Sequence, residues 1–454
     1  MNHKKFSNNL KKAAVYVALY VFTIIIVISA FILKPTPTWD YPILRGVIIF
    51  FCTILLTKYF FYMLLSPWYD IYTARKKKKY ELSTRRYKPM VSVLIPAWNE
   101  SCGIIRTMET VLKSTYTNME LVVINDGSTD DSDKLINEFI KSYKILTSTK
   151  KLIPIVYQYQ QNGGKGAALN KAVSLSHGDI LLTIDADCAV MPDTIENFVR
   201  HFRDRKVMAA VGNVKVGNNK HLLGVIQQLE FLFSFYFKKA DSLMNTIYII
   251  GGAAGAFRRE VFEKIGGFNT TNITEDIDLS VRIQKAGMKT VYADDAIVYT
   301  EGASEIKGLL KQRLRWKRGR FETFFQHSEL FFSDKKEHNK ILTWLILPFA
   351  CLAEVQLSME LGFLAFLYIY SYLIHDFSSF IPGILIVSCM FFVQILFDDT
   401  QKAPGYLYFL APIGWLLFYL ATFVEVSALV NSVLGLVQKK KITWQKWERV
   451  GVDG

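Results

Sequence analysis

Cysteine is scarce in this sequence, and the few cysteines present are scattered. The chain of 454 residues contains five, and none belongs to a Cys-x-x-Cys pair. Without that spacing the sequence offers neither a disulfide framework nor a cysteine-based zinc site, so we expect all five to be reduced and structural. Internal repeats and low-complexity tracts are absent as well. The length accommodates two or three structural units.

Acidic residues are also in short supply. Forty Asp and Glu residues stand against 54 Lys and Arg residues, which gives a net charge of +14. Such an excess favours an anionic partner. We do not expect nucleic acid, because no basic stripe interleaved with aromatic residues is present. The densest basic run, residues 75–79, directly follows an apolar segment and is better interpreted as a cytoplasmic anchor that faces lipid head groups.

Apolar residues make up 51% of the chain, as expected if part of it lies in lipid. Residues 13–33 and 43–65 are each long and apolar enough to cross a bilayer. No small-residue cleavage site follows the first run, so we expect a retained helix and not a signal peptide. Basic residues before the first run and after the second predict a cytoplasmic N-terminus. Lys58, inside the second run, either snorkels to the interface or lines a polar path.

Three further apolar stretches, residues 341–374, 381–397 and 406–437, follow the central part of the chain. Three crossings would place the basic residues 439–441 outside, against the positive-inside tendency, so two or three C-terminal crossings remain open. We therefore expect two N-terminal transmembrane helices (1–65), a cytoplasmic domain (66–335) and C-terminal transmembrane or interfacial helices with a basic tail (336–454). This is the organisation of a multi-pass inner-membrane protein.

The central part alternates predicted strands with predicted helices. Short apolar runs at 91–95, 121–124, 153–156 and 180–184 are separated by segments with helical periodicity, such as 104–112 and 132–143. Strands that are apolar on both faces predict an α/β domain with a mainly parallel sheet flanked by helices. Ligands bind such sheets at the carboxyl ends of the strands. Pro96, Asp126 and Asp185 lie at those ends.

Two of these strand ends carry carboxylates. Asp126, in the sequence Asn-Asp-Gly-Ser, can accept hydrogen bonds from a ligand, although the same residues also favour a plain turn. Asp185 and Asp187 stand at i and i+2 and can face one ligand. Mg²⁺ typically takes one or two protein carboxylates together with substrate phosphates, and a departing nucleotide diphosphate needs that neutralisation. The alternative for this pair is a solvated turn or a helix N-terminus.

Two glycine-rich segments suggest close approach of the backbone to another group. Residues 163–166, Gly-Gly-Lys-Gly, fail the phosphate-loop test because Gly-x-x-x-x-Gly-Lys-[Ser/Thr] is absent. Lys165 is kept as a nucleotide-contacting lysine, with a solvated turn as the alternative. Residues 251–255, Gly-Gly-Ala-Ala-Gly, either line an acceptor site or serve tight packing.

The segment 274–278, Thr-Glu-Asp-Ile-Asp, opens a predicted helix. Threonine followed by acids is a favourable helix start, which is one explanation. The other is a general base, because a positioned carboxylate that takes the proton of a sugar hydroxyl accelerates its attack. Charge alone does not decide which acid serves.

Gln312, Arg315 and Trp316 stand at i, i+3 and i+4 and share one helix face. Arginine offers a forked donor for phosphate oxygens, and the tryptophan ring offers a flat surface for a sugar. The surrounding apolar and basic residues also fit an amphipathic helix on the membrane surface. Both interpretations can hold together.

In this order and spacing, the motifs resemble the processive family 2 glycosyltransferases, which include synthases of cellulose, hyaluronan, chitin and poly-N-acetylglucosamine. Residues 273–278 and 311–316 are most similar to those of the poly-β-1,6-N-acetylglucosamine synthases. The resemblance implies a GT-A fold, inversion at the sugar carbon, a UDP-sugar donor and a divalent cation, Mg²⁺ or Mn²⁺. It extends over nearly the whole chain.

The resemblance also implies roles for individual residues. Asp276 would be the catalytic base, Asp126 would contact the uridine, and Asp185 and Asp187 would hold UDP and the metal. Further contacts to the substrates would come from Pro96, Asn99, Glu100, Gln312, Arg315 and Trp316. Beside these, we expect Lys165 and Glu275 to bind substrate as well. Ala253 and Ala254 depart from the glycine-rich acceptor loop of the family, which leaves the acceptor contacts and the product open.

The sequence therefore predicts a membrane-embedded inverting glycosyltransferase that polymerises a β-linked polysaccharide, with UDP-N-acetylglucosamine as the preferred donor and with export as a coupled step. Its partners would be the UDP-sugar, the growing polysaccharide, the lipid bilayer and a small membrane or export subunit. A non-processive enzyme acting on a lipid carrier is the alternative, and a nucleotide-gated transporter is a remote one.

Overall fold

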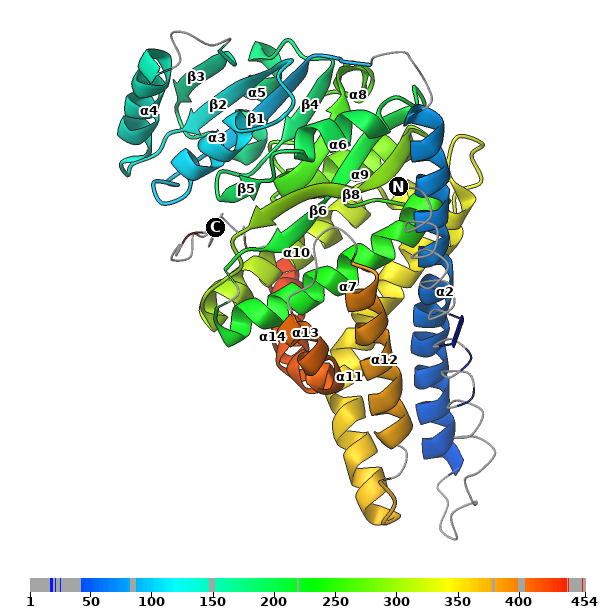
Figure 1. The fold of residues 1–454 in the computed structure, drawn as a ribbon. Helices are drawn as coiled ribbons and strands as arrows, with labels where there is room; N and C mark the ends of the chain where they lie inside the picture. The colour runs from blue at the N-terminus through cyan, green and yellow to red at the C-terminus, as the bar shows by residue number, and fades with distance from the viewer. Residues whose placement is uncertain are drawn as a thin grey trace.

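An eight-stranded sheet covered by helices forms one end of the molecule, and long helices extend from it (Figure 1). This is a computed structural model, and it describes residues 17, 18, 21, 25, 42–81, 87–146, 152–218, 220–377, 380–398, 405–438, 440 and 451. Of the predicted first span, 13–33, all but four residues therefore lie outside the described part.

The first four strands are parallel, as the sequence predicted. They run in the order β3-β2-β1-β4, and three helices connect them along the chain. The strands are β1 (Val91–Ala97), β2 (Met119–Asp126), β3 (Ile155–Gln160) and β4 (Ile180–Thr183), and the helices are α3 (Ile104–Leu112), α4 (Ser132–Leu146) and α5 (Lys165–Leu175). Because parallel strands end at one edge, the ends of β1, β2 and β4 lie together.

Beyond β4 the sheet is mixed, so the prediction of a mainly parallel sheet fails in this half. Strand β7 is antiparallel to both β4 and β6, β5 is antiparallel to β8, and only β6 and β8 are parallel. The elements here are β5 (Cys188–Val190), α6 (Thr194–His201), β6 (Val207–Val216), β7 (Gly255–Arg258), α8 (Arg259–Ile265), α9 (Glu275–Lys285) and β8 (Lys289–Thr300). An apolar run indicates burial on both faces but carries no strand direction, which is why the sequence did not distinguish the halves.

The two faces of the sheet bury separate hydrophobic cores. Alternate residues of β2 point to opposite sides, so Leu121 and Val123 join one core and Val122 and Ile124 the other. Burial on both faces fixes the register, because a one-residue slip would exchange the two sets. The strand ends that carry the predicted site are thus held by a rigid frame.

The remaining helices join the sheet domain to an apolar bundle. They are α2 (Pro42–Glu81), α7 (Leu222–Met244), α10 (Ile306–Gln326), α11 (Leu347–Leu373), α12 (Phe380–Leu396), α13 (Gly405–Leu410) and α14 (Gly414–Val437). Helices α2, α11 and α12 extend in one direction away from the sheet (Figure 1). Helix α7 packs on β6 and β8, and its Lys239 pairs with Asp70 of α2 at 2.8 Å, which ties α2 to the sheet domain.

Within the described residues, two helical segments are long and apolar enough to cross a membrane, Leu342–Leu373 and Gly405–Val437. The predicted second span and the basic run that follows it form the single helix α2. The side chain of Lys58 and most of the tail 439–441 lie outside the described part. The topology and the number of crossings stay predictions.

Candidate active site

The carboxylate of Asp126, at the end of β2, organises the turn that precedes α5. Its Oδ1 accepts hydrogen bonds from Gln160 Nε2 at 2.7 Å and Gly163 N at 2.9 Å, and its Oδ2 accepts one from Gly164 N at 2.8 Å. Gly164 has a φ of +86°, which glycine adopts without strain. Asp126 is only 3% exposed. The carboxylate therefore fixes the backbone immediately before Lys165.

The end of β1 is tied to the same region. Pro96 lies within β1 beside Ile124 of β2. Asn99 follows with a φ of +54°, and its Oδ1 accepts a hydrogen bond from the Thr129 amide at 2.7 Å. A left-handed non-glycine residue is uncommon, and such positions cluster at functional sites. The buried Glu100 comes next, and its carbonyl accepts hydrogen bonds from the amides of Gly103 and Ile104 at the start of α3.

Lys165 is the centre of the site. Its Nζ lies 2.6 Å from Asp185 Oδ1 and 3.4 Å from Glu275 Oε1. Burial opposes the lysine charge, but the carboxylates of Asp185, Glu275 and Asp276 outweigh it and raise the pKa of Lys165 above its ordinary value. Lys165 therefore stays charged at neutral pH. It joins the start of α5 to the turn after β4 and to the start of α9, so it does not lie on a solvated turn.

Asp278 is excluded as the base by its surroundings. It is fully buried, with Oδ2 accepting a hydrogen bond from Arg282 Nε at 2.8 Å and Oδ1 lying 3.1 Å from His327 Nε2. Burial alone would favour the neutral acid, but His327 and Arg282 lower the pKa of Asp278. This carboxylate links α9 to the end of α10 and is structural.

The two remaining acids at the start of α9 differ in exposure. Glu275 is 5% exposed and is paired with Lys165, and burial raises its pKa. Asp276 is half-buried, and its oxygens accept hydrogen bonds from Gly252 N at 3.0 Å and Ile277 N at 2.9 Å. Asp276 is thus the most accessible of the three acids and lies against the glycine-rich segment, as a base that meets an acceptor must.

The glycine-rich segment 251–255 approaches the site closely. A Cβ on Gly252 would lie 2.7 Å from Lys165 Nζ and 3.4 Å from Asp185 Oδ1, so a larger residue there would displace the lysine head group. Two further hydrogen bonds hold the preceding residues, from Lys238 Nζ to Ile249 O at 3.0 Å and from Ile250 N to Ser280 Oγ at 2.8 Å. Sequence reasoning missed Lys238, because nothing near it in the chain indicates this contact.

Asp185 and Asp187 supply the oxygen ligands that a hard divalent cation requires. Both are half-buried and lie in the turn between β4 and β5. One oxygen of Asp185 faces Lys165, and the pair matches the one or two carboxylates that Mg²⁺ takes from a protein beside substrate phosphates. The donor set therefore fits Mg²⁺ or Mn²⁺.

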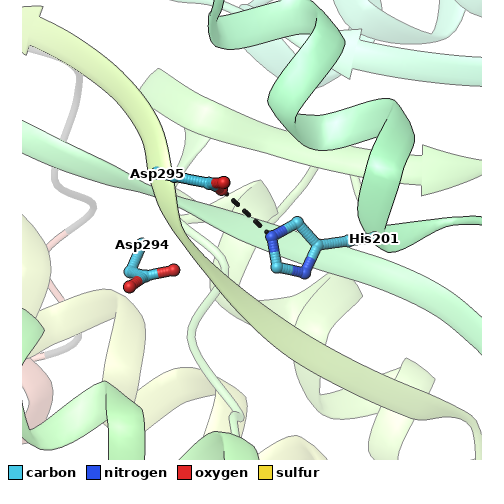
Figure 2. Close-up of side chains that lie close together, drawn as sticks. All are labelled: His201, Asp294 and Asp295. Carbon is cyan, nitrogen blue, oxygen red and sulfur yellow. Dashed lines mark hydrogen bonds and ion pairs between the residues drawn. The ribbon is translucent and has the colours of Figure 1, made fainter. Parts of the chain in front are cut away.

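A separate group of potential metal ligands was not predicted. His201 of α6 and Asp294 and Asp295 of β8 place one ligand atom each within 4.8 Å of one another. Figure 2 shows the contact between His201 Nε2 and Asp295 Oδ1, at 3.1 Å. Burial raises the pKa of Asp294 to about 6, and Tyr69 of α2 donates to it at 3.3 Å. This cluster includes neither Asp185 nor Asp187, and its members are too far apart in sequence to form a motif.

Gln312, Arg315 and Trp316 lie on α10, as predicted. Gln312 is 7% exposed and its Oε1 has no hydrogen-bond partner within the described part of the chain, while the other two are half-buried. Helix α10 packs on the start of α9, where a Cβ on Gly319 would lie only 2.1 Å from Thr274 Oγ1. The helix also contacts α14, so it lies between the sheet domain and the apolar bundle.

The structure thus brings some of the predicted residues into direct contact. Lys165 contacts Asp185 and Glu275, Asp276 lies near enough to raise the pKa of Lys165, and Asp126 is hydrogen-bonded to the turn before Lys165. Gln312 and Trp316 make no hydrogen bond or ion pair with this group in the part that the structure describes. They are connected to it through the packing of α10 on α9.

Comparisons with known proteins identify a family. The profile of the family described as "Glycosyltransferase like family 2" matches residues 89–319. A poly-beta-1,6-N-acetyl-D-glucosamine synthase of Staphylococcus epidermidis is 26% identical over 371 residues, which cover 79% of this chain and 86% of that protein. The corresponding synthase of Staphylococcus aureus strain MSSA476 is 31% identical over 248 residues, 54% of this chain and 57% of that one.

A solved structure has a similar fold. A mannosyltransferase from Pyrobaculum calidifontis, in complex with GDP-Man and Mn²⁺, matches with a TM-score of 0.52 and 18% identity, over 86% of this chain and 99% of that one. At this identity the similarity concerns the fold alone.

Proposed function

The chain belongs to glycosyltransferase family 2, and we propose that within this family it is a membrane-embedded, inverting polymerase that extends a β-linked polysaccharide from a UDP-sugar. The observation that carries the proposal is the contact of Lys165 with both Asp185 and Glu275, beside Asp276. This arrangement places a cation that can bind a diphosphate, Lys165, beside an accessible carboxylate that can accept the proton of an acceptor hydroxyl, Asp276.

The donor would bind along the ends of β1, β2 and β4. Asn99 and Asp126 shape the loops there, and Lys165 supplies a positive charge that a departing UDP needs. Asp185 and Asp187 would hold a divalent cation, which neutralises charge on the diphosphate when bound. Arg315 on α10 would add a forked donor for phosphate oxygens.

The acceptor would approach from the glycine-rich segment. Asp276 would take the proton of the attacking hydroxyl as its oxygen forms a bond to the anomeric carbon and the bond from that carbon to the UDP oxygen breaks. The amide of Gly252 holds Asp276 Oδ2 at 3.0 Å and so fixes the carboxylate. Attack on the face opposite the leaving UDP inverts the sugar carbon.

Polymerisation, and UDP-N-acetylglucosamine as donor, are supported by the relatives described above and by the Gln312–Trp316 segment at the junction with the apolar bundle. The two long apolar helices support a membrane location. The basic run at residues 75–79 favours a cytoplasmic sheet domain by the positive-inside tendency. Transfer of a single sugar to a lipid carrier is the alternative that the product distinguishes.

The test is incorporation of labelled sugar by the purified full chain in nanodiscs. UDP-N-acetylglucosamine, UDP-glucose and UDP-glucuronate are offered separately with Mg²⁺ or Mn²⁺, and the product is sized. We expect a long polymer from UDP-N-acetylglucosamine, and Asp276→Asn should abolish it while UDP still binds. A product with one added sugar would refute polymerisation, and full activity of Asp276→Asn would refute the base.

A further inference from the structure

Helix α10 carries a second stripe of charged residues next to the one that holds Gln312 and Trp316. Arg313, Lys317 and Arg320 recur at i, i+4 and i+7 and share a face. The side chains of Arg313 and Lys317 are each 9% exposed and that of Arg320 is 27% exposed, so this stripe is largely buried. Buried cations of this kind require partners.

The partners are carboxylates from three other helices. Arg313 Nη2 lies 2.5 Å from Glu230 Oε2 of α7, and Arg313 Nε lies 3.1 Å from Glu425 Oε1 of α14. The other oxygen of Glu425 is 3.0 Å from Lys317 Nζ. Glu354 of α11 completes the network, 2.7 Å from both Lys317 Nζ and Arg320 Nη1.

Two of these carboxylates lie in unusual places. Glu354 and Glu425 belong to the two helical segments that are long and apolar enough to cross a membrane. An ionisable residue within such a segment is expensive and faces a partner or a functional path. Here both face α10, so each of these helices contributes a charge to the helix that carries the predicted acceptor residues.

Arg313 connects the network to Trp316. Its guanidinium carbon lies 4.5 Å from the centre of the indole ring, within the range of a cation–π contact. The same cation is held by Glu230 and Glu425. The ring orientation therefore depends on a side chain whose position is set from α7 and α14.

We propose that Arg313 is a positioning residue for Trp316, and that Glu425 of α14 sets the ring through it, so that an apolar helix of the bundle controls how the site holds a pyranose ring of the acceptor. The inference rests on the proposed function, since it takes Trp316 as an acceptor contact. Through this contact, a displacement of α14 would change acceptor binding and leave nucleotide binding at the end of the site near Lys165 unchanged. The residues of that end, around Lys165, make no ion pair with this network within the described chain.

The experiment compares Glu425→Gln with the wild type in nanodiscs. Glutamine keeps the size of the side chain. The ion pairs of Arg313 with Glu230 and of Lys317 with Glu354 remain in the variant, so the helices stay connected. We expect the KM for an oligosaccharide acceptor to rise by up to about tenfold, because tenfold corresponds to complete loss of a desolvated cation–π contact of roughly 1.4 kcal/mol and Glu230 still holds Arg313. The dissociation constant for UDP should not change.

Glu360→Gln is the matched control, because Glu360 lies on α11, accepts a 3.5 Å hydrogen bond from Thr422 Oγ1 and forms no ion pair with Arg313 within the described residues. Arg313→Lys keeps the charge but loses the planar group that stacks, so it should reproduce the acceptor defect. In a Trp316→Phe background, Glu425→Gln should add little, because residues that act through one another are not additive.

The outcomes separate the two proposals. A wild-type chain that transfers no sugar from any of the offered UDP-sugars would refute the proposed function itself. If the wild type polymerises, an unchanged acceptor KM in Glu425→Gln, an equal defect in Glu360→Gln, an equal loss of UDP affinity, or full additivity with Trp316→Phe would overturn the inference.

Discussion

Replacing Gly319 with alanine tests whether the packing of α10 on α9 sets the catalytic geometry. The added Cβ would lie 2.1 Å from Thr274 Oγ1, 2.4 Å from Cγ2 and 2.7 Å from Cβ. Rotation of the threonine side chain cannot relieve this clash, because its Cβ does not move. Since ordinary contact begins at 3.4 Å, α10 must shift away from the start of α9.

The expected shift affects activity more than stability. Overpacking of this kind costs ~1–3 kcal/mol, and alanine is about 1 kcal/mol more favourable than glycine in a helix interior, so the net loss of stability is small. A displacement of roughly 1 Å within an active site, in contrast, can lower the rate by about 10²-fold. Thr274 directly precedes Glu275 and Asp276, and Trp316 lies one turn before Gly319, so the displacement separates the base from the acceptor residues.

The assay measures sugar incorporation and thermal unfolding of each variant in the same detergent. Gly435→Ala on α14 is the control, because its Cβ would meet only Arg318 Nη1, at 3.6 Å. Thr274→Ala removes the two closest atoms, so the double variant Gly319→Ala/Thr274→Ala should regain part of the lost activity. A fully active Gly319→Ala, or a loss equal to that of Gly435→Ala, would refute the reasoning.

Three further outcomes follow from the site. Lys165→Met should weaken UDP binding at least tenfold in calorimetry, because the carboxylate of Asp185 then meets the diphosphate without its cation; unchanged affinity would remove Lys165 from the donor site. Asp278→Asn should lower the unfolding free energy by on the order of 3 kcal/mol, because it removes the fully buried carboxylate that pairs with Arg282 at 2.8 Å and contacts His327 at 3.1 Å, and normal stability in denaturant titration would contradict a structural role. Burial lowers the pKa of Lys238 from 10.5 to about 8 in the folded chain, so the unfolded chain binds more protons between these values. Stability of the wild type should therefore rise with pH from about 8 to 10.5 relative to Lys238→Met, and parallel curves would contradict the burial of the charge.

The strand ends were predictable because two independent signals coincide there. A buried strand needs a continuous apolar run, and the carboxyl edge of a parallel sheet collects polar residues for ligands. Asp126 and Asp185 stand directly after such runs, and the structure places them at the ends of β2 and β4. The expected helix at Gln312 and Trp316 is present for a similar reason, since their spacing needs no knowledge of tertiary contacts.

The choice among neighbouring acids was not predictable, because it depends on groups distant in the chain. Glu275 is paired by a lysine 110 positions earlier, and Asp278 is held by His327 at the far end of α10. Each acid has the same local character in sequence. Only the tertiary approach of α5 and α10 leaves Asp276 as the accessible one.

The basic stripe of α10 shows where a charge pattern is ambiguous. Lys317 and its neighbours fit a helix on a membrane surface. The same basic residues, however, can pair either with lipid head groups or with buried glutamates. The sequence did hold the deciding signal elsewhere, in Glu354 and Glu425 within otherwise apolar stretches. A carboxylate in such a stretch requires a cationic partner, and the basic helix that directly precedes the apolar helices in the chain can supply it. A carboxylate in an apolar helix should therefore be matched with a cationic partner before a nearby basic helix is assigned to the membrane surface.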